Sequence, residues 1–232
     1  MQDILLIYIF KFFLTFLAYV GLDKIFTDVI KFNGVYYIIH TVNNAVITYY
    51  TFPSLLYSYN NFLEYDKYPI TYDSSILTFA LHLYHIIVYY KKLRFDDWLH
   101  HILMCFFVLP AGLYINSGCL LDYSLFFITG VPGGISYFVL FLNRNNYITR
   151  YRQKQIDTYI NLWIRTPGCI SSSTLSILAY KNYQNNFTYS QSYVFYFIVV
   201  SIYWNGIYFM NQTVQNYALF KERQQIKKLT NE

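Results

Sequence analysis

All five histidines of the chain fall within apolar stretches, and four of them lie between positions 82 and 101. They are His40, His82, His85, His100 and His101. An imidazole can accept or donate a proton near neutral pH, and it can bind a metal. In the interior of a bilayer such a group is costly unless it faces a partner or a wet cavity. The histidines therefore predict a buried polar site with functional chemistry.

The adjacent histidine pair lies in the segment DDWLHHILM, where each histidine follows an aspartate by four residues. Residues four apart share one face of a helix. A carboxylate there can orient an imidazole and raise its basicity, as a general base requires. The alternative for at least one aspartate is a helix N-terminal cap. The candidate catalytic residues are His100, His101 and Asp97, with His85 from the preceding apolar segment.

Further polar residues lie on other apolar segments. Asn43 and Asn44 follow His40 at helical spacing, and the last apolar segment carries several amides. Such stripes also join helices through hydrogen bonds. The residues predicted to bind lipid are His40, Asn44, Arg165, Asn211 and Gln215.

Arg165 lies in the middle of an apolar segment and therefore needs an anion, a carbonyl group or water. Asp122 is a formal partner by charge, but its predicted depth is different. A phosphate or carboxylate of a substrate is the other possibility.

The composition is that of an integral membrane protein. The 232 residues are 56% hydrophobic and only 12% charged, and the mean hydropathy is +0.27. These values are too apolar for an ordinary soluble domain. Three cysteines in separate apolar segments predict neither a disulfide framework nor a metal site. We expect membrane lipids as partners and no nucleic acid, while the oligomeric state stays open.

Seven apolar runs are long enough to be membrane-spanning helices. The fold expected is thus all-α and polytopic. A turn is predicted at Asn116-Ser117-Gly118, and Gly130 to Gly134 interrupt the fifth run. Prolines inside runs should disrupt their helices. The predicted segments are 4–20, 34–57, 74–90, 98–117, 118–142, 156–180 and 194–219.

The basic residues predict an N-terminus outside and a cytosolic C-terminus. With that orientation, 13 of the 17 Lys and Arg residues fall in inner segments and only Lys67 and Lys181 in outer loops. The outer loop 181–193 also carries a glycosylation acceptor, Asn186-Phe187-Thr188. We interpret residues 1–33 as a retained anchor and inner loop, 34–219 as a six-helix membrane domain, and 220–232 as a basic cytosolic tail.

The direction of each predicted helix also gives the depth of its residues in the membrane, because each residue advances about 1.5 Å along the helix axis. On this basis four histidines lie within roughly 10 Å of the inner boundary. His82 is deeper, and we expect it to be structural.

Two other histidine chemistries fit the sequence less well. Five histidines are few for a di-iron hydroxylase or desaturase. A retinal protein needs a lysine in the last helix, and 194–219 contains none.

Three segments, HTVNNAVITYY, LHLYHIIVYY and DDWLHHILM, resemble the TLC-domain family, which includes ceramide synthases, translocating-chain-associating membrane proteins and lipid-homeostasis proteins. The resemblance runs from about residue 34 to 219. It implies a barrel of about six helices in the endoplasmic reticulum or a related membrane, with a cavity for a lipid tail. In ceramide synthases the histidine pair is implicated in N-acylation by acyl-CoA. This chain has His85 where the family often has an acid, and it lacks a downstream aspartate pair.

Three functions follow as hypotheses. The first is a protein that binds or senses lipid and modulates membrane lipid composition. The second is a lipid N-acyltransferase with no bound cofactor and acyl-CoA as co-substrate. The third is a proton or ion channel in which the histidines relay protons.

Overall fold

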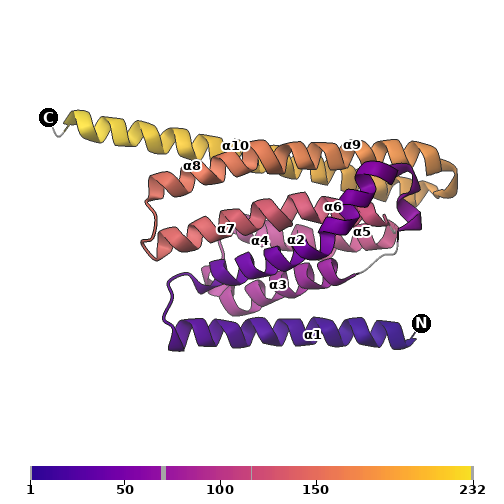
Figure 1. Cartoon of the computed structure of the whole chain (residues 1–232), viewed down its shortest axis with the longest axis horizontal. Helices are drawn as coiled ribbons and strands as arrows, with labels where there is room; N and C mark the ends of the chain where they lie inside the picture. Colours follow the sequence, from indigo (N-terminus) through magenta and orange to yellow (C-terminus); the bar gives the residue numbers. More distant parts are fainter. Residues whose placement is uncertain (1, 69–71, 116, 231–232) are drawn as a thin grey trace.

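The computed structural model describes residues 2–68, 72–115 and 117–230, and within these ranges the chain is almost entirely helical and contains no strand (Figure 1). The predicted all-α fold is thereby confirmed for this part of the chain. The seven predicted segments correspond to seven continuous helices, several of which contain π or 3-10 turns. The α-helical parts are α1 Gln2–Lys24, α2 Val35–Asn61, α3 Asp73–Tyr89, α4 Phe95–Ile102 with α5 Leu109–Ile115, α6 Cys119–Leu125 with α7 Val131–Arg144, α8 Arg150–Ile160 with α9 Thr166–Tyr183, and α10 Tyr189–Thr230.

The predicted break between the fourth and fifth helices lies where α5 ends and α6 begins. Asn116, the first residue of the predicted turn, lies outside the described residues. Gly118 has a φ of 55°, and a Cβ there would be 2.2 Å from the carbonyl oxygen of Tyr65. Only glycine fits this turn, because it has no Cβ and tolerates positive φ. The expected interruption at 130–134 does not end the helix, which continues into α7.

Three prolines inside helices are each preceded by a π-helical segment. Proline lacks an N–H, and its ring clashes with the carbonyl group four residues earlier. In all three cases that carbonyl group belongs to the π-helical segment, whose wider turn gives the ring room. At these positions the expected disruption takes the form of a widened turn, whereas Pro53 lies within the continuous α-helix α2 and does not produce one. The pairs are Leu103–Val108 with Pro110, Phe126–Gly130 with Pro132, and Asn161–Arg165 with Pro167.

The helices run roughly side by side, and the two ends of the chain lie at opposite ends of the molecule (Figure 1). α2 packs against α3, α6 and α7, while α8 contacts α7 and α10. α10 in turn packs on α5, and α4 packs against α3. These contacts join the second to seventh helices in a closed ring, and α1 packs on the outside against α3.

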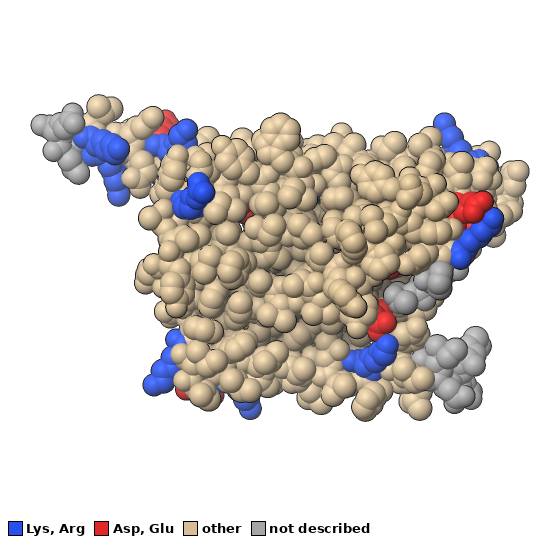
Figure 2. Space-filling view, in the orientation of Figure 1, with Lys and Arg blue, Asp and Glu red and all other residues tan. Residues whose placement is uncertain are grey.

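Four of the seven helices are long and apolar enough to cross a membrane. They are Leu5–Val29, Phe95–Ile115, Cys119–Arg144 and Tyr189–Thr230. The other three carry most of the buried polar residues, which lowers their hydropathy. Figure 2 shows charged side chains at the two ends of the molecule and on the C-terminal tail, with a broad uncharged surface between them. The chain is therefore an all-helical, multi-pass membrane protein.

A buried aspartate joins three of the helices. Asp122 on α6 is 6% exposed, and its carboxylate accepts hydrogen bonds from Ser54 on α2 at 2.9 Å and from Ser74 on α3 at 2.5 Å. The carboxylate is thus occupied by serines, and it forms no ion pair with Arg165. In a medium without water, such bonds hold helices together.

We expect Asp122→Ala to destabilise the protein by about 2–4 kcal/mol, because it leaves two buried hydroxyls without their acceptor. Asp122→Asn keeps one acceptor oxygen and should lose less. Thermal unfolding of purified protein in detergent measures both. An alanine variant that unfolds at the wild-type temperature would show that the network contributes little.

Candidate functional site

A large cavity of about 1020 Å³ lies within the ring of helices. Its lining includes the exposed residues Lys92, Arg94 and Arg144 near the ends of helices, and it reaches Thr78 and Ile128 farther along α3 and the fifth helix. Four of the five histidines line it, namely His40, His82, His85 and His100. His101 is not part of the lining, but it is hydrogen-bonded to His85, which is. The structure thus brings all five histidines to one site.

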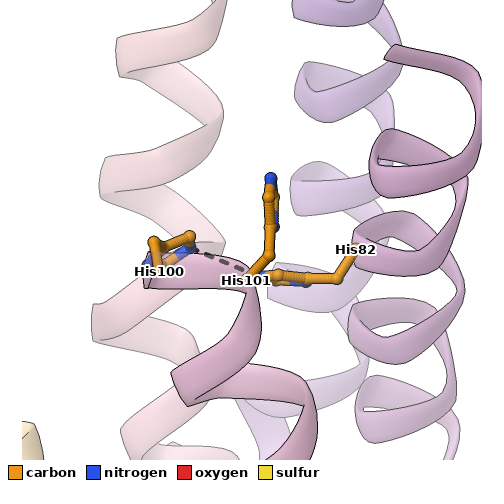
Figure 3. A group of neighbouring side chains, drawn as sticks. All are labelled: His82, His100 and His101. Carbon is orange, nitrogen blue, oxygen red and sulfur yellow. Dashed lines mark hydrogen bonds between the residues drawn. The ribbon is translucent and has the colours of Figure 1, made fainter. Parts of the chain in front are cut away.

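Four imidazoles form two pairs between α3 and α4. The Nε2 atoms of His82 and His100 are 3.3 Å apart (Figure 3). His101 Nε2 and His85 Nδ1 are 2.9 Å apart. His82 Nδ1 lies 2.7 Å from the carbonyl oxygen of Thr78, to which it must donate a hydrogen bond. The imidazoles are therefore held mainly by one another and by the backbone.

Aromatic rings enclose the other side of this group. His40 is 5% exposed, and its ring centroid lies 4.1 Å from that of Tyr137 and 5.3 Å from that of His85. The ring of Tyr36 stacks on His85 at 5.0 Å. His40 Nε2 is buried and has no hydrogen-bond partner among the described residues. One nitrogen of this imidazole therefore has no partner within the described protein.

Asp97 does not orient either histidine of the adjacent pair, contrary to the catalytic role predicted for it. Its carboxylate accepts hydrogen bonds from the backbone N–H of Arg94 at 3.0 Å and from Arg94 Nε at 3.2 Å. This is the N-terminal cap of α4, the alternative interpretation of the sequence. The hydrogen bond to Asp97 also raises the pKa of Arg94, so this pair stays ionised.

His82 is part of the cluster rather than a separate structural residue, which corrects the expectation from depth. His82 and His85 are three residues apart on α3 and share the face that meets α4. Three residues of helix correspond to about 4.5 Å of depth, a distance that an imidazole side chain can span. The i, i+3 spacing was the signal that could have placed His82 correctly.

Asn44 is a packing residue and does not line the cavity. It is 1% exposed, and its Oδ1 accepts a hydrogen bond from Thr129 Oγ1 at 3.0 Å. A Cβ added to Gly133 would lie 2.7 Å from Asn44 Nδ2, so α2 and α7 approach closely here. The lipid-binding role predicted for Asn44 is replaced by helix association, the alternative already considered for such polar stripes.

The predicted residues Asn211 and Gln215 also lie outside the cavity. Both are exposed on α10, where Gln215 Nε2 donates to Asn211 Oδ1 at 3.0 Å. The face of α10 that lines the cavity instead carries Asn205, Phe209 and Thr213. Residues spaced by four lie on one face of a helix, so this spacing was the sequence signal that could have identified the cavity-lining face of α10.

Arg165 is a buried cation in the wall of the cavity. It is 6% exposed, and its guanidinium carbon lies 4.5 Å from the ring centroid of Phe209. Within the described part of the chain, no carboxylate lies within 4.0 Å of the guanidinium, and Arg165 Nε is buried without a hydrogen-bond partner. Asp157 also lines the cavity, but its Oδ1 accepts hydrogen bonds from Ser136 at 2.6 Å and Asn161 at 3.2 Å.

These features define what the site can do chemically. An unpaired guanidinium in a low-dielectric wall attracts an anion, because burying a charge without a partner is costly. The paired imidazoles can pass a proton between them or donate lone pairs to a ligand. The aromatic rings offer an apolar surface beside both groups.

No family model, no curated protein and no solved structure matches this chain.

Proposed function

We propose that this protein binds a lipid with an anionic headgroup in the cavity, and in this way senses or modulates membrane lipid composition. The observation that carries the proposal is Arg165, a buried guanidinium without a carboxylate partner in the described chain, in the wall of a cavity of about 1020 Å³. A phosphate or carboxylate can accept two parallel hydrogen bonds from a guanidinium. The volume is of the size that holds a substantial part of a small amphiphile.

The charges around the cavity support an anion as the occupant. Lys92, Arg94, Arg144 and Arg165 line it, whereas Asp97 and Asp157 are its acidic residues. Asp97 is paired with Arg94, whereas Asp157 accepts hydrogen bonds from the neutral Ser136 and Asn161 and keeps its charge, so the lining holds four basic side chains against two carboxylates. The exposed basic residues can attract an anionic headgroup toward Arg165.

The membrane arrangement proposed has seven spans, with the N-terminus outside and the cavity opening toward the cytosol. It rests on the distribution of basic residues in the sequence and on the alternation of seven helices. The closed ring formed by the second to seventh helices is compatible with a TLC-like barrel, and the three similar segments lie within it. A location in the endoplasmic reticulum belongs to the same proposal.

We expect Arg165→Gln to reduce retention of anionic lipid by about tenfold or more, because a charge-assisted hydrogen-bonded pair contributes roughly 1.5–3 kcal/mol. Mass spectrometry of lipids released from protein purified in mild detergent measures the retention. Vesicle lipids and inorganic phosphate, supplied separately, distinguish a headgroup on a tail from a free anion.

Arg152→Gln is the matched control, because Arg152 is exposed on α8, outside the cavity, and hydrogen-bonds Gln155. It should leave lipid retention unchanged. Equal lipid content in wild type and Arg165→Gln would contradict the proposal. If purified wild-type protein retains no lipid but conducts protons in liposomes, the channel hypothesis would be favoured instead.

Acyl transfer is a second candidate, favoured by the 2.9 Å contact between His101 Nε2 and His85 Nδ1. A general base needs an imidazole whose tautomer is fixed by a neighbour, and His85 supplies that neighbour in place of Asp97. His100 and His101 would then act on an amine acceptor, with acyl-CoA arriving from the cytosol.

If the protein is an N-acyltransferase, acyl-CoA with a long-chain base will yield free CoA, and His101→Ala will reduce the rate by about 100-fold or more, the contribution typical of a general base. A thiol reagent follows the release of CoA. Turnover that persists in His101→Ala would assign the base to another residue. Absence of turnover in wild type, with lipid retained, would leave binding as the function.

We expect glycosylation at Asn186 when the protein is expressed in eukaryotic cells. Asn186 is exposed in the loop between α9 and α10, at the opposite end of α10 from its basic tail. Asn211-Gln212-Thr213 is a second acceptor sequence, but it lies within α10, which provides an internal control. Asn186→Gln should abolish the endoglycosidase-sensitive mobility shift, whereas Asn211→Gln should not. A shift that depends on Asn211 would contradict the proposed orientation.

A further inference from the structure

Three imidazoles from two helices converge on one point beside the cavity. His82 comes from α3, and His100 and His101 come from α4. Each can offer one ring nitrogen such that the three nitrogens lie within 4.8 Å of one another. Figure 3 shows His82 and His100 facing each other with His101 beside them.

The hydrogen bonds around His82 direct a lone pair into this point. Because a carbonyl oxygen only accepts, the contact with Thr78 requires the proton of His82 to be on Nδ1. In the neutral ring, Nε2 is then unprotonated, and it lies 3.3 Å from His100 Nε2. Two nitrogens bound to one tetrahedral zinc ion at about 2.0 Å are about 3.3 Å apart. The observed separation, which without a metal is that of a hydrogen bond between the two rings, therefore also matches two ligands on a shared ion.

His101 supplies the third nitrogen. Its Nε2 is taken up by His85, whereas its Nδ1 is buried and has no hydrogen-bond partner among the described residues. His101 is 3% exposed, so bulk water does not satisfy this atom. With Nδ1 on a metal, Nε2–H donates to His85 Nδ1, and this bond fixes the tautomer as supporting hydrogen bonds do in metal sites. A single assignment of protons to the ring nitrogens is therefore compatible with the hydrogen bonds of His82 and His101 and with a bound metal.

We propose that His82 Nε2, His100 Nε2 and His101 Nδ1 bind a single divalent transition-metal ion, with zinc as the best fit. Imidazole ligands suit zinc and its neighbours in the first transition row, and the set contains no oxygen ligand that would favour magnesium or calcium. Three protein ligands leave a fourth coordination position open. His82 and His100 both line the cavity, so that position faces it. The site is independent of the lipid proposal.

The metal content of purified protein tests this site directly. The affinity tag must be removed, because a polyhistidine tag binds the same metals. After chelation and incubation with ZnCl₂, wild-type protein should hold one zinc ion per chain by inductively coupled plasma mass spectrometry. His82→Gln and His100→Gln should each lose it. His40→Gln removes an imidazole from the same cavity but not from the cluster, and it should keep the metal.

Two further measurements separate a metal site from a structural role of the histidines. Zinc should raise the unfolding temperature of wild type but not that of His82→Gln, and His82→Cys should restore binding. Cobalt(II) bound to wild type should show the visible absorption of tetrahedral coordination. Arg165→Gln should retain zinc even where it loses lipid, so the two proposals fail separately. Substoichiometric zinc that is the same in wild type and His82→Gln would overturn the metal site.

Discussion

The constraint on which the structure depends is that a polar group in the membrane interior must find its partner within the protein. The helices meet it in two ways. Hydroxyl groups such as those of Thr51 and Thr78 donate to carbonyl groups of their own helix. Asp122 instead joins three helices through two serines. Against this background, the polar atoms without a partner are informative, because several of them, on His40, His101 and Arg165, gather around a single cavity.

The same constraint explains why distorted helices surround the site. A π-helical turn frees backbone groups and is tolerated in a membrane only where neighbours or a cavity can satisfy them. The π-helical segments before Pro110, Pro132 and Pro167 each contribute a residue to the cavity wall, namely Met104, Thr129 and Arg165. Proline thus has two effects here. It widens the turn, and the widened turn lies where the ring of helices encloses space.

Much of the fold was predictable from the sequence, because runs of apolar residues separated by turns and charged residues mark the seven segments, although hydropathy and length alone identify only four of them as spans. The grouping of His40, His85, His100 and His101 was also predictable, since depth follows from helix direction. Rotation about each helix axis was not, because packing determines it. For that reason the sequence does not reveal that Asn211 and Gln215 lie on the face of α10 outside the cavity. The spacing of Asp97 does not decide its role, because four residues to His101 and three to Arg94 both allow a hydrogen bond. The free N–H groups at the start of a helix favour the cap.

The histidine cluster is where binding and catalysis compete for the same atoms. A metal on His101 Nδ1 leaves that ring without a free lone pair, since Nε2–H donates to His85. His101 could not then accept a proton, and any acid–base chemistry would move to a ligand in the open coordination position, whose bound water is acidified by the ion. Without the metal, the same lone pair is free to act as a base. A bound cation would also place a second positive centre in the cavity that contains Arg165. In both cases the occupant that we propose for the cavity is an anion, because the wall presents cationic charge that its own carboxylates do not fully compensate.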